Sequence, residues 1–89
     1  MNKLEAARER INQLDAQMLE LFQERMSAVK DVAEYKKENN LSIFDSTREA
    51  SLIEKNVSML KDKSLEPFYR MFLEGVLTSS KEYQKGLIK

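Results

Sequence analysis

Hydrophobic residues recur at three- and four-residue steps through residues 3–39, and no Gly or Pro interrupts the run. This spacing is typical of one face of an α-helix, so it predicts a single long helix over residues 3–39. At about 1.5 Å per residue, that helix would be roughly 55 Å long, which exceeds the diameter of a small domain. One chain therefore cannot cover the whole apolar face, which comprises Leu4, Ala7, Ile11, Leu14, Met18, Leu21, Val29 and Val32.

The pattern farther along the chain predicts two shorter helices, over residues 46–60 and 66–86. Asn2 can cap the long helix, and either Asp45 or Ser46 can cap the first of the two shorter ones. The composition favours helices as well, because Leu, Glu, Lys, Ala and Ser dominate and the chain has only two Gly and one Pro. We therefore expect an all-α fold of three helices, one of them very long, in a single domain over residues 1–89.

Two cations interrupt the apolar face of the first helix. At about 100° per residue, Arg25 falls near the centre of that face, and Lys36 returns to within about 20° of the same direction. Burying a charge is costly unless an opposite charge meets it. Acidic side chains or an anionic ligand are therefore expected beside Arg25 and Lys36.

Other polar residues intrude on the apolar faces of the predicted helices: Glu49, Ser80 and Gln84, with Arg8 and Arg48 on the shoulders. Together with the two cations, they resemble the lining of a pocket for a small dianion that carries hydroxyl or ether oxygens, because guanidinium groups clamp carboxylates. Each also has an ordinary structural explanation. Arg25 could pair with a core glutamate, and Lys36 could simply complement the dipole at the helix end. Asp45 could be a helix cap, and Glu49 could be the far half of a capping box that Ser46 begins.

The composition excludes several classes of chemistry. The chain has no Cys and no His, so it offers no disulfide, no thiolate and no imidazole for metal binding or base catalysis, and we expect neither a metal nor a cofactor. Fifteen basic and fifteen acidic residues cancel, which argues against nucleic acid as a partner. No stretch predicts a membrane span or a signal peptide, so we expect a cytoplasmic protein. Catalysis would have to rest on positioning and electrostatics.

The combination of these residues resembles the all-helical class of chorismate mutases over nearly the whole chain. The similarity is carried by Leu4–Asp15, by Leu19–Arg25, by Lys36, by the Asp45, Arg48 and Glu49 cluster, and by Ser80 with Gln84 four residues later. The match is weakest at the sequence SSKEYQ, where the similarity could be shifted by one residue, so Ser79 is the alternative to Ser80 as the site serine.

The resemblance implies a catalyst for the rearrangement of chorismate to prephenate, a step toward phenylalanine and tyrosine that needs no cofactor. It implies that Arg8 and Arg25 clamp the two carboxylates of the substrate and that Ser80 assists. Lys36 and Gln84 would donate to the ether oxygen, and Lys36 would also lie near a carboxylate.

At the ring hydroxyl of the substrate, the resemblance implies that Glu49 is the acceptor, together with the backbone near Asp45. It also implies that Arg48 braces this region.

Arg8 and Arg25 lie about 25 Å apart along one helix, so they cannot meet on one small molecule from the same chain. If Arg8 belongs to the site, a partner chain must supply it. We therefore expect an intertwined homodimer in which two long helices pack antiparallel.

Two other functions remain open from the sequence. A helical dimerisation module without catalysis would use the same faces, with Arg25, Lys36 and Glu49 satisfying one another. Related helical enzymes remove pyruvate from isochorismate, and Gln84 with Glu49 favours the mutase over that lyase. Family members are often fused to another enzyme of the aromatic pathway, so the chain could belong to a larger protein.

Overall fold

The computed structural model describes residues 2–88, and its helices are α1 (Lys3–Glu38), α2 (Ser46–Ser58), the short 3-10 helix η1 (Lys63–Leu65) and α3 (Glu66–Ile88). Residues 1 and 89 of the expected domain lie outside this range. The described residues contain no strand, so the prediction of an all-α fold with one very long N-terminal helix is confirmed. The helix ends differ from the predicted ones by one or two residues. The third helix continues past Gly86 because this glycine does not adopt the positive φ that ends many helices.

Short polar side chains begin the two helices for which caps were predicted. Asn2 Oδ1 accepts a hydrogen bond from the backbone N–H of Glu5 at 2.9 Å, as expected for an N-cap. At α2 the cap is Asp45, whose Oδ1 accepts from the N–H of Arg48 at 3.0 Å. The alternative cap, Ser46, is the first residue of the helix instead.

The end of α1 fixes the path of the connector that follows. Asn40 has a φ of 54°, and the N–H of Leu41 donates to the carbonyl of Lys36 at 2.8 Å. The N–H of Asn40 donates to the carbonyl of Lys37 at 3.4 Å, which completes a Schellman motif. The chain thereby turns sharply and leads back along α1.

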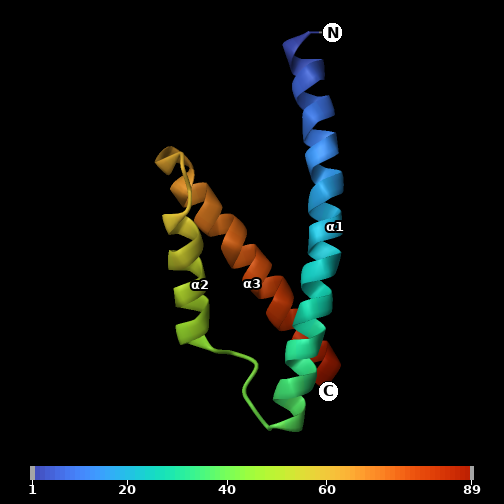
Figure 1. The fold of residues 1–89 in the computed structure, drawn as a ribbon, viewed down its shortest axis with the longest axis vertical. Helices are drawn as coiled ribbons and strands as arrows, with labels where there is room; N and C mark the ends of the chain where they lie inside the picture. The colour runs from blue at the N-terminus through green and yellow to red at the C-terminus, as the bar shows by residue number, and fades with distance from the viewer. Residues whose placement is uncertain (1, 89) are drawn as a thin grey trace.

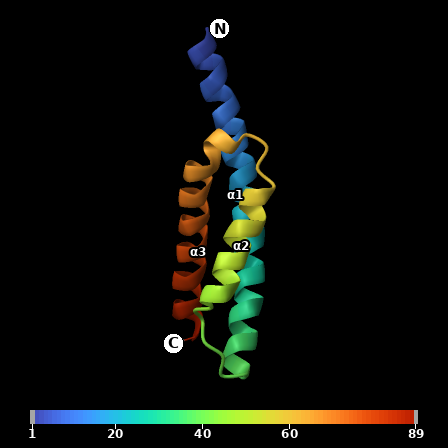
Figure 2. The ribbon, with the colours of Figure 1, turned by 90° about the vertical axis from the view of Figure 1, so that its left-hand side faces the viewer.

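Helix α3 lies beside the C-terminal half of α1, and α2 packs against α3 and stands apart from α1 (Figure 1). Helix α2 runs opposite to α1, and α3 returns in the direction of α1 while it packs against both other helices. In the side view, the N-terminal part of α1 extends beyond the other helices (Figure 2). The molecule is accordingly elongated, with extents of 55 × 25 × 15 Å.

The hydrophobic core is small and lies where the three helices meet. Its buried apolar residues are Val29, Ala33, Val57, Leu73 and Leu77. Most of the apolar face of α1 stays exposed, as its length predicts: Leu4, Ile11, Leu14, Met18 and Leu21 are each between 44% and 63% exposed. The chain therefore leaves a long apolar surface uncovered. Within residues 2–88, no helix has both the length and the apolarity to span a membrane.

Candidate functional site

A cavity of about 300 Å³ lies between the three helices and the connector. Its apolar walls come from Ala28, Val29, Val32, Ile43, Leu52 and Leu77. Four cationic, two anionic and two neutral polar side chains complete the lining: Arg25, Lys36, Arg48, Lys81, Asp45, Glu49, Ser80 and Gln84. Seven of the eight residues that the sequence predicted for a site are therefore brought to one cavity, and only Arg8 is not.

Arg25 is oriented by a buried hydroxyl. Its Nη1 donates a hydrogen bond to Ser80 Oγ, and Ser80 in turn donates to the carbonyl of Val76 at 2.9 Å. Ser80 is 5% exposed, and the side chain lies on the cavity face of α3. Ser79 lines a different concavity, so of the two serines it is Ser80 that faces the polar cavity.

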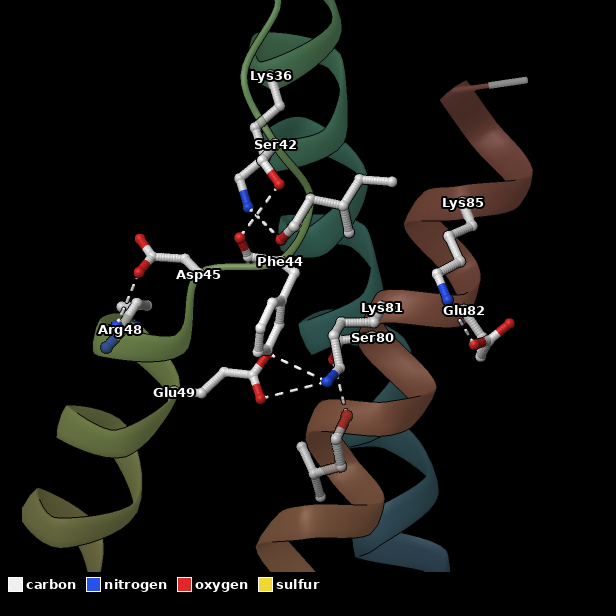
Figure 3. A network of polar contacts seen from close by, with 12 residues as sticks. Lys36, Ser42, Phe44, Asp45, Arg48, Glu49, Ser80, Lys81, Glu82 and Lys85 are labelled. Carbon is white, nitrogen blue, oxygen red and sulfur yellow. Dashed lines mark hydrogen bonds and ion pairs between the residues drawn. The ribbon is translucent and has the colours of Figure 1, made fainter.

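Lys36 ties the connector to α1. Its Nζ donates to the carbonyl of Ile43 at 2.9 Å, and the residue is half-buried (Figure 3). An ammonium group has three N–H donors, so this bond leaves others for a ligand in the cavity. Lys36 is thus more than a cation that favours the helix end.

Glu49 is not part of a capping box, because its carboxylate faces α3 instead of the start of its own helix. Its Oε1 and Oε2 each lie 3.3 Å from Lys81 Nζ, and the two side chains are about one-fifth and one-quarter exposed. Lys81 Nζ also lies 4.7 Å from the centroid of the Phe44 ring (Figure 3). The sequence analysis missed Lys81. Its position three residues before Gln84 places it on the same face of the helix, but the flanking charges make it resemble an ordinary surface lysine.

Asp45 and Arg48 form the exposed rim of the cavity at the start of α2. The side chain of Asp45 is committed to capping the helix, as its ordinary structural explanation predicted. Both residues are therefore held by the first turn of α2, next to Glu49.

Gln84 is almost as buried as Ser80, with 6% of its surface exposed. Its Oε1 is buried and has no hydrogen-bond partner among residues 2–88. Leaving a buried polar group unpaired costs about 1–3 kcal/mol, so such a group needs an explanation, and a role in ligand binding is one of them. The amide can also present its NH₂ group after rotation by half a turn, and it can therefore donate to a ligand oxygen.

Arg8 is exposed on the N-terminal half of α1, about 25 Å along the helix axis from Arg25. No other helix lies beside this part of α1 (Figures 1 and 2). The chain alone therefore does not bring Arg8 to the cavity.

A second concavity, of about 660 Å³, is a largely apolar groove between α1 and α3. Arg25 borders both this groove and the polar cavity. The other residues of the apolar groove are Met18, Leu21, Phe22, Met26, Met71, Phe72, Leu73, Gly75, Val76 and Ser79.

The acidic residues of the cavity are not arranged as a metal site. Within the part of the chain that the structure describes, no group of three or more acidic side chains is placed to hold a metal ion. Arginine and lysine are the prevailing charged residues of the cavity, and they suit an anion instead.

Comparison with known proteins gives two matches. The sequence model of the chorismate mutase type II family matches residues 7–85. The bifunctional chorismate mutase/prephenate dehydratase of Buchnera aphidicola subsp. Acyrthosiphon pisum (strain APS) is 32% identical over 89 residues, which are 99% of this chain and 23% of that relative. The chain thus spans less than a quarter of the length of the relative. No solved structure matches the chain significantly.

The family match includes every residue that lines the polar cavity, and it covers most of all three helices. It also includes Arg8, the predicted site residue that the cavity lacks. The chain belongs to the chorismate mutase type II family, a family of isomerases.

Proposed function

We propose that the chain catalyses the rearrangement of chorismate to prephenate in aromatic amino-acid biosynthesis, in the cytoplasm. In this unimolecular reaction one C–O bond breaks while one C–C bond forms, so no group is transferred to the protein. The observation that carries the proposal is the convergence of Arg25, Lys36, Glu49 and Gln84 from three helices on one cavity. These residues offer charge and hydrogen bonds without a nucleophile, which is what such a reaction requires.

The carboxylates of the substrate are proposed to bind the cations. Arg25 is already oriented by Ser80, so its guanidinium loses little conformational freedom when it clamps a carboxylate. The apolar walls at Val29, Val32 and Leu77 limit the space around the ring. Both features favour a compact conformer of the substrate, in which the two carbon atoms that become bonded lie close together.

Lys36 and Gln84 are proposed to donate to the ether oxygen, on which negative charge grows as the C–O bond breaks. Donors that are fixed before the reaction lower the barrier, because they need no reorganisation in the transition state. Lys36 is fixed by the carbonyl of Ile43, and burial confines the Gln84 side chain to the cavity. Glu49 would accept a hydrogen bond from the ring hydroxyl, with Arg48 and the backbone at Asp45 beside it.

An intertwined homodimer is proposed to complete the site with the partner's Arg8. The exposed apolar face of α1 and the apolar groove of α1 and α3 supply a surface that a second copy could cover. Because the groove borders Arg25, a partner helix that lies antiparallel in it would approach the polar cavity. Such packing would bring an arginine from the far end of α1 to the second carboxylate.

The alternative of a non-catalytic dimerisation module is less well supported. That function predicts that Arg25, Lys36 and Glu49 neutralise one another. Arg25 instead donates to a hydroxyl and Lys36 to a carbonyl, and neither forms an ion pair within residues 2–88. Two cations that face a cavity without carboxylate partners favour an anionic ligand.

Loss of chorismate absorbance, with prephenate identified as the product, tests the proposal. Lys36→Ala should lower kcat/KM by about 100-fold or more, since one preorganised donor to the developing charge is lost. Lys37→Ala is a matched control, because this neighbouring lysine is exposed and lies outside the cavity. Absence of turnover by the folded wild-type protein would contradict the mutase, and release of pyruvate from isochorismate would identify the lyase.

The name of the Buchnera relative joins a chorismate mutase with a prephenate dehydratase. We propose that prephenate made by this chain likewise passes to a further enzyme of the aromatic pathway, either fused to it or separate.

A further inference from the structure

Lys81 connects three separate segments around one edge of the polar cavity. It belongs to α3, it lies 3.3 Å from both carboxylate oxygens of Glu49 on α2, and it lies 4.7 Å from the ring of Phe44 in the connector. Figure 3 shows the end of the lysine side chain directed toward both the Glu49 carboxylate and the Phe44 ring. Its side chain is 28% exposed, so these interactions are less screened by water than those of a surface lysine.

The position of the Glu49 carboxylate depends on this lysine. A glutamate side chain has three rotatable bonds and loses considerable freedom when it is held in one geometry. Within residues 2–88, Lys81 is the only side chain that hydrogen-bonds or ion-pairs with Glu49. A carboxylate has about four lone-pair positions, so a single ammonium group leaves acceptor sites free for a ligand.

We propose that Lys81 is a positioning residue, an inference that rests on the proposed function. It holds the Glu49 carboxylate in place to accept a hydrogen bond from the ring hydroxyl of the substrate. The Phe44 ring assists, because a cation above an aromatic face is attracted to it, and this contact restrains the lysine in addition to its ion pair with Glu49. Lys81 acts through Glu49 and need not touch the substrate.

A double-mutant cycle tests this role, with steady-state kinetics of wild type, Lys81→Met, Glu49→Gln and the double variant. Lys81→Met should raise KM about tenfold with a smaller change in kcat, since one charge-assisted contact is misplaced. In the Glu49→Gln background the same change should have no further effect, because the two residues act as one unit. Lys81→Arg should restore most of the affinity, because it keeps the charge and the donors.

The control variant is Lys85→Met, one turn farther along α3. Lys85 is 56% exposed and pairs with Glu82, outside the polar cavity, so its loss should leave the kinetics unchanged. Circular dichroism checks that each variant keeps its helix content, and Lys81→Gln replaces Lys81→Met in the cycle if the methionine variant loses helix.

Three results would contradict the proposal in different ways. Equal effects of Lys81→Met with and without Glu49 would mean that the lysine acts on the substrate directly, and no effect in either background would mean that Glu49 is positioned without it. Either result leaves the mutase intact. Absence of turnover by the wild-type protein would remove the proposed function, and the role of Lys81 with it.

Discussion

The guanidinium of Arg25 on α1 donates a hydrogen bond to the buried hydroxyl of Ser80 on α3. This bond orients a cation that would otherwise be free to rotate in the polar cavity. Ser80→Ala should therefore lower kcat/KM for chorismate by about tenfold, mainly through KM, because the charge remains but its direction is lost. Steady-state kinetics measure the change.

Ser79→Ala is the matched control for Ser80→Ala, since Ser79 lies beside Ser80 and faces the apolar groove instead of the polar cavity. Its kinetics and oligomeric state should equal those of wild type. Equal losses in both variants would mean that the Ser80 effect comes from the helix and not from Arg25.

Gln84→Glu should confine activity to acidic pH. A neutral amide donates at any pH, whereas a carboxyl group donates only when it is protonated. At neutral pH an ionised carboxylate would face the ether oxygen and oppose the growing negative charge, so kcat should fall by about 100-fold or more. The pH profile of kcat for the variant and wild type checks this, and a variant that is unaffected at neutral pH would remove Gln84 from the site.

Two inactive variants should restore activity when they are mixed, if sites are shared between chains. Arg8→Ala and Arg25→Ala each damage every site of their own homodimer. After random exchange, half of the dimers are heterodimers with one intact site of two, so about a quarter of wild-type activity is expected. Exchange is verified with two tags on the subunits, and confirmed exchange without recovery would show that each chain builds its own site.

The ion pair of Glu54 and Arg70 should make the stability depend on acid pH. Hydrogen bonds from Arg70, at 2.8 and 3.3 Å, lower the pKa of Glu54 below its ordinary value, and the positive charge of Arg70 adds to this shift. The pair therefore stabilises the folded state above the ordinary glutamate pKa of about 4.3, and this contribution is lost as the pH falls through the lower folded value.

Glu54→Gln removes that contribution, so the variant should unfold at lower urea concentration than wild type at pH 7, and the difference should shrink as the pH falls below the ordinary glutamate pKa of about 4.3. Urea unfolding at one fixed protein concentration measures this, because association also affects stability. The difference should be small, since both side chains are exposed to water. A difference in unfolding midpoint that stays unchanged as the pH is lowered would contradict the assignment.

The helices were predictable because apolar spacing and capping residues are local signals. Asn2 and Asp45 each cap a helix as the sequence indicates, and residues 3–38 form one helix because nothing in the run opposes it. Lys81 could not be found in this way. Its importance depends on Glu49 and Phe44, which lie 32 and 37 positions earlier in the chain, and only the packing of α2 and the connector on α3 brings them together.

The candidate site was predictable to the extent that polar residues on apolar faces stand out. Arg25, Ser80 and Gln84 occupy positions where the helical pattern calls for apolar residues, and all three line the cavity. The sequence could not distinguish Ser80 from Ser79, since a shift by one residue rotates a side chain by about 100° and only the packing of α3 fixes that angle. Glu49 was compatible with a capping box, and tertiary pairing with Lys81 overrides that local option.

The unbroken helix α1 also fixes two quantities between its ends: the distance along the helix axis and the angle around that axis at which the side chains point. Inserting one residue between Arg8 and Arg25 would advance the N-terminal half by about 1.5 Å and turn it by about 100°, so Arg8 would point to another face. Inserting seven residues would nearly restore that angle but would move Arg8 by about 10 Å. Between Arg8 and Arg25, substitutions should therefore be tolerated far more readily than insertions or deletions.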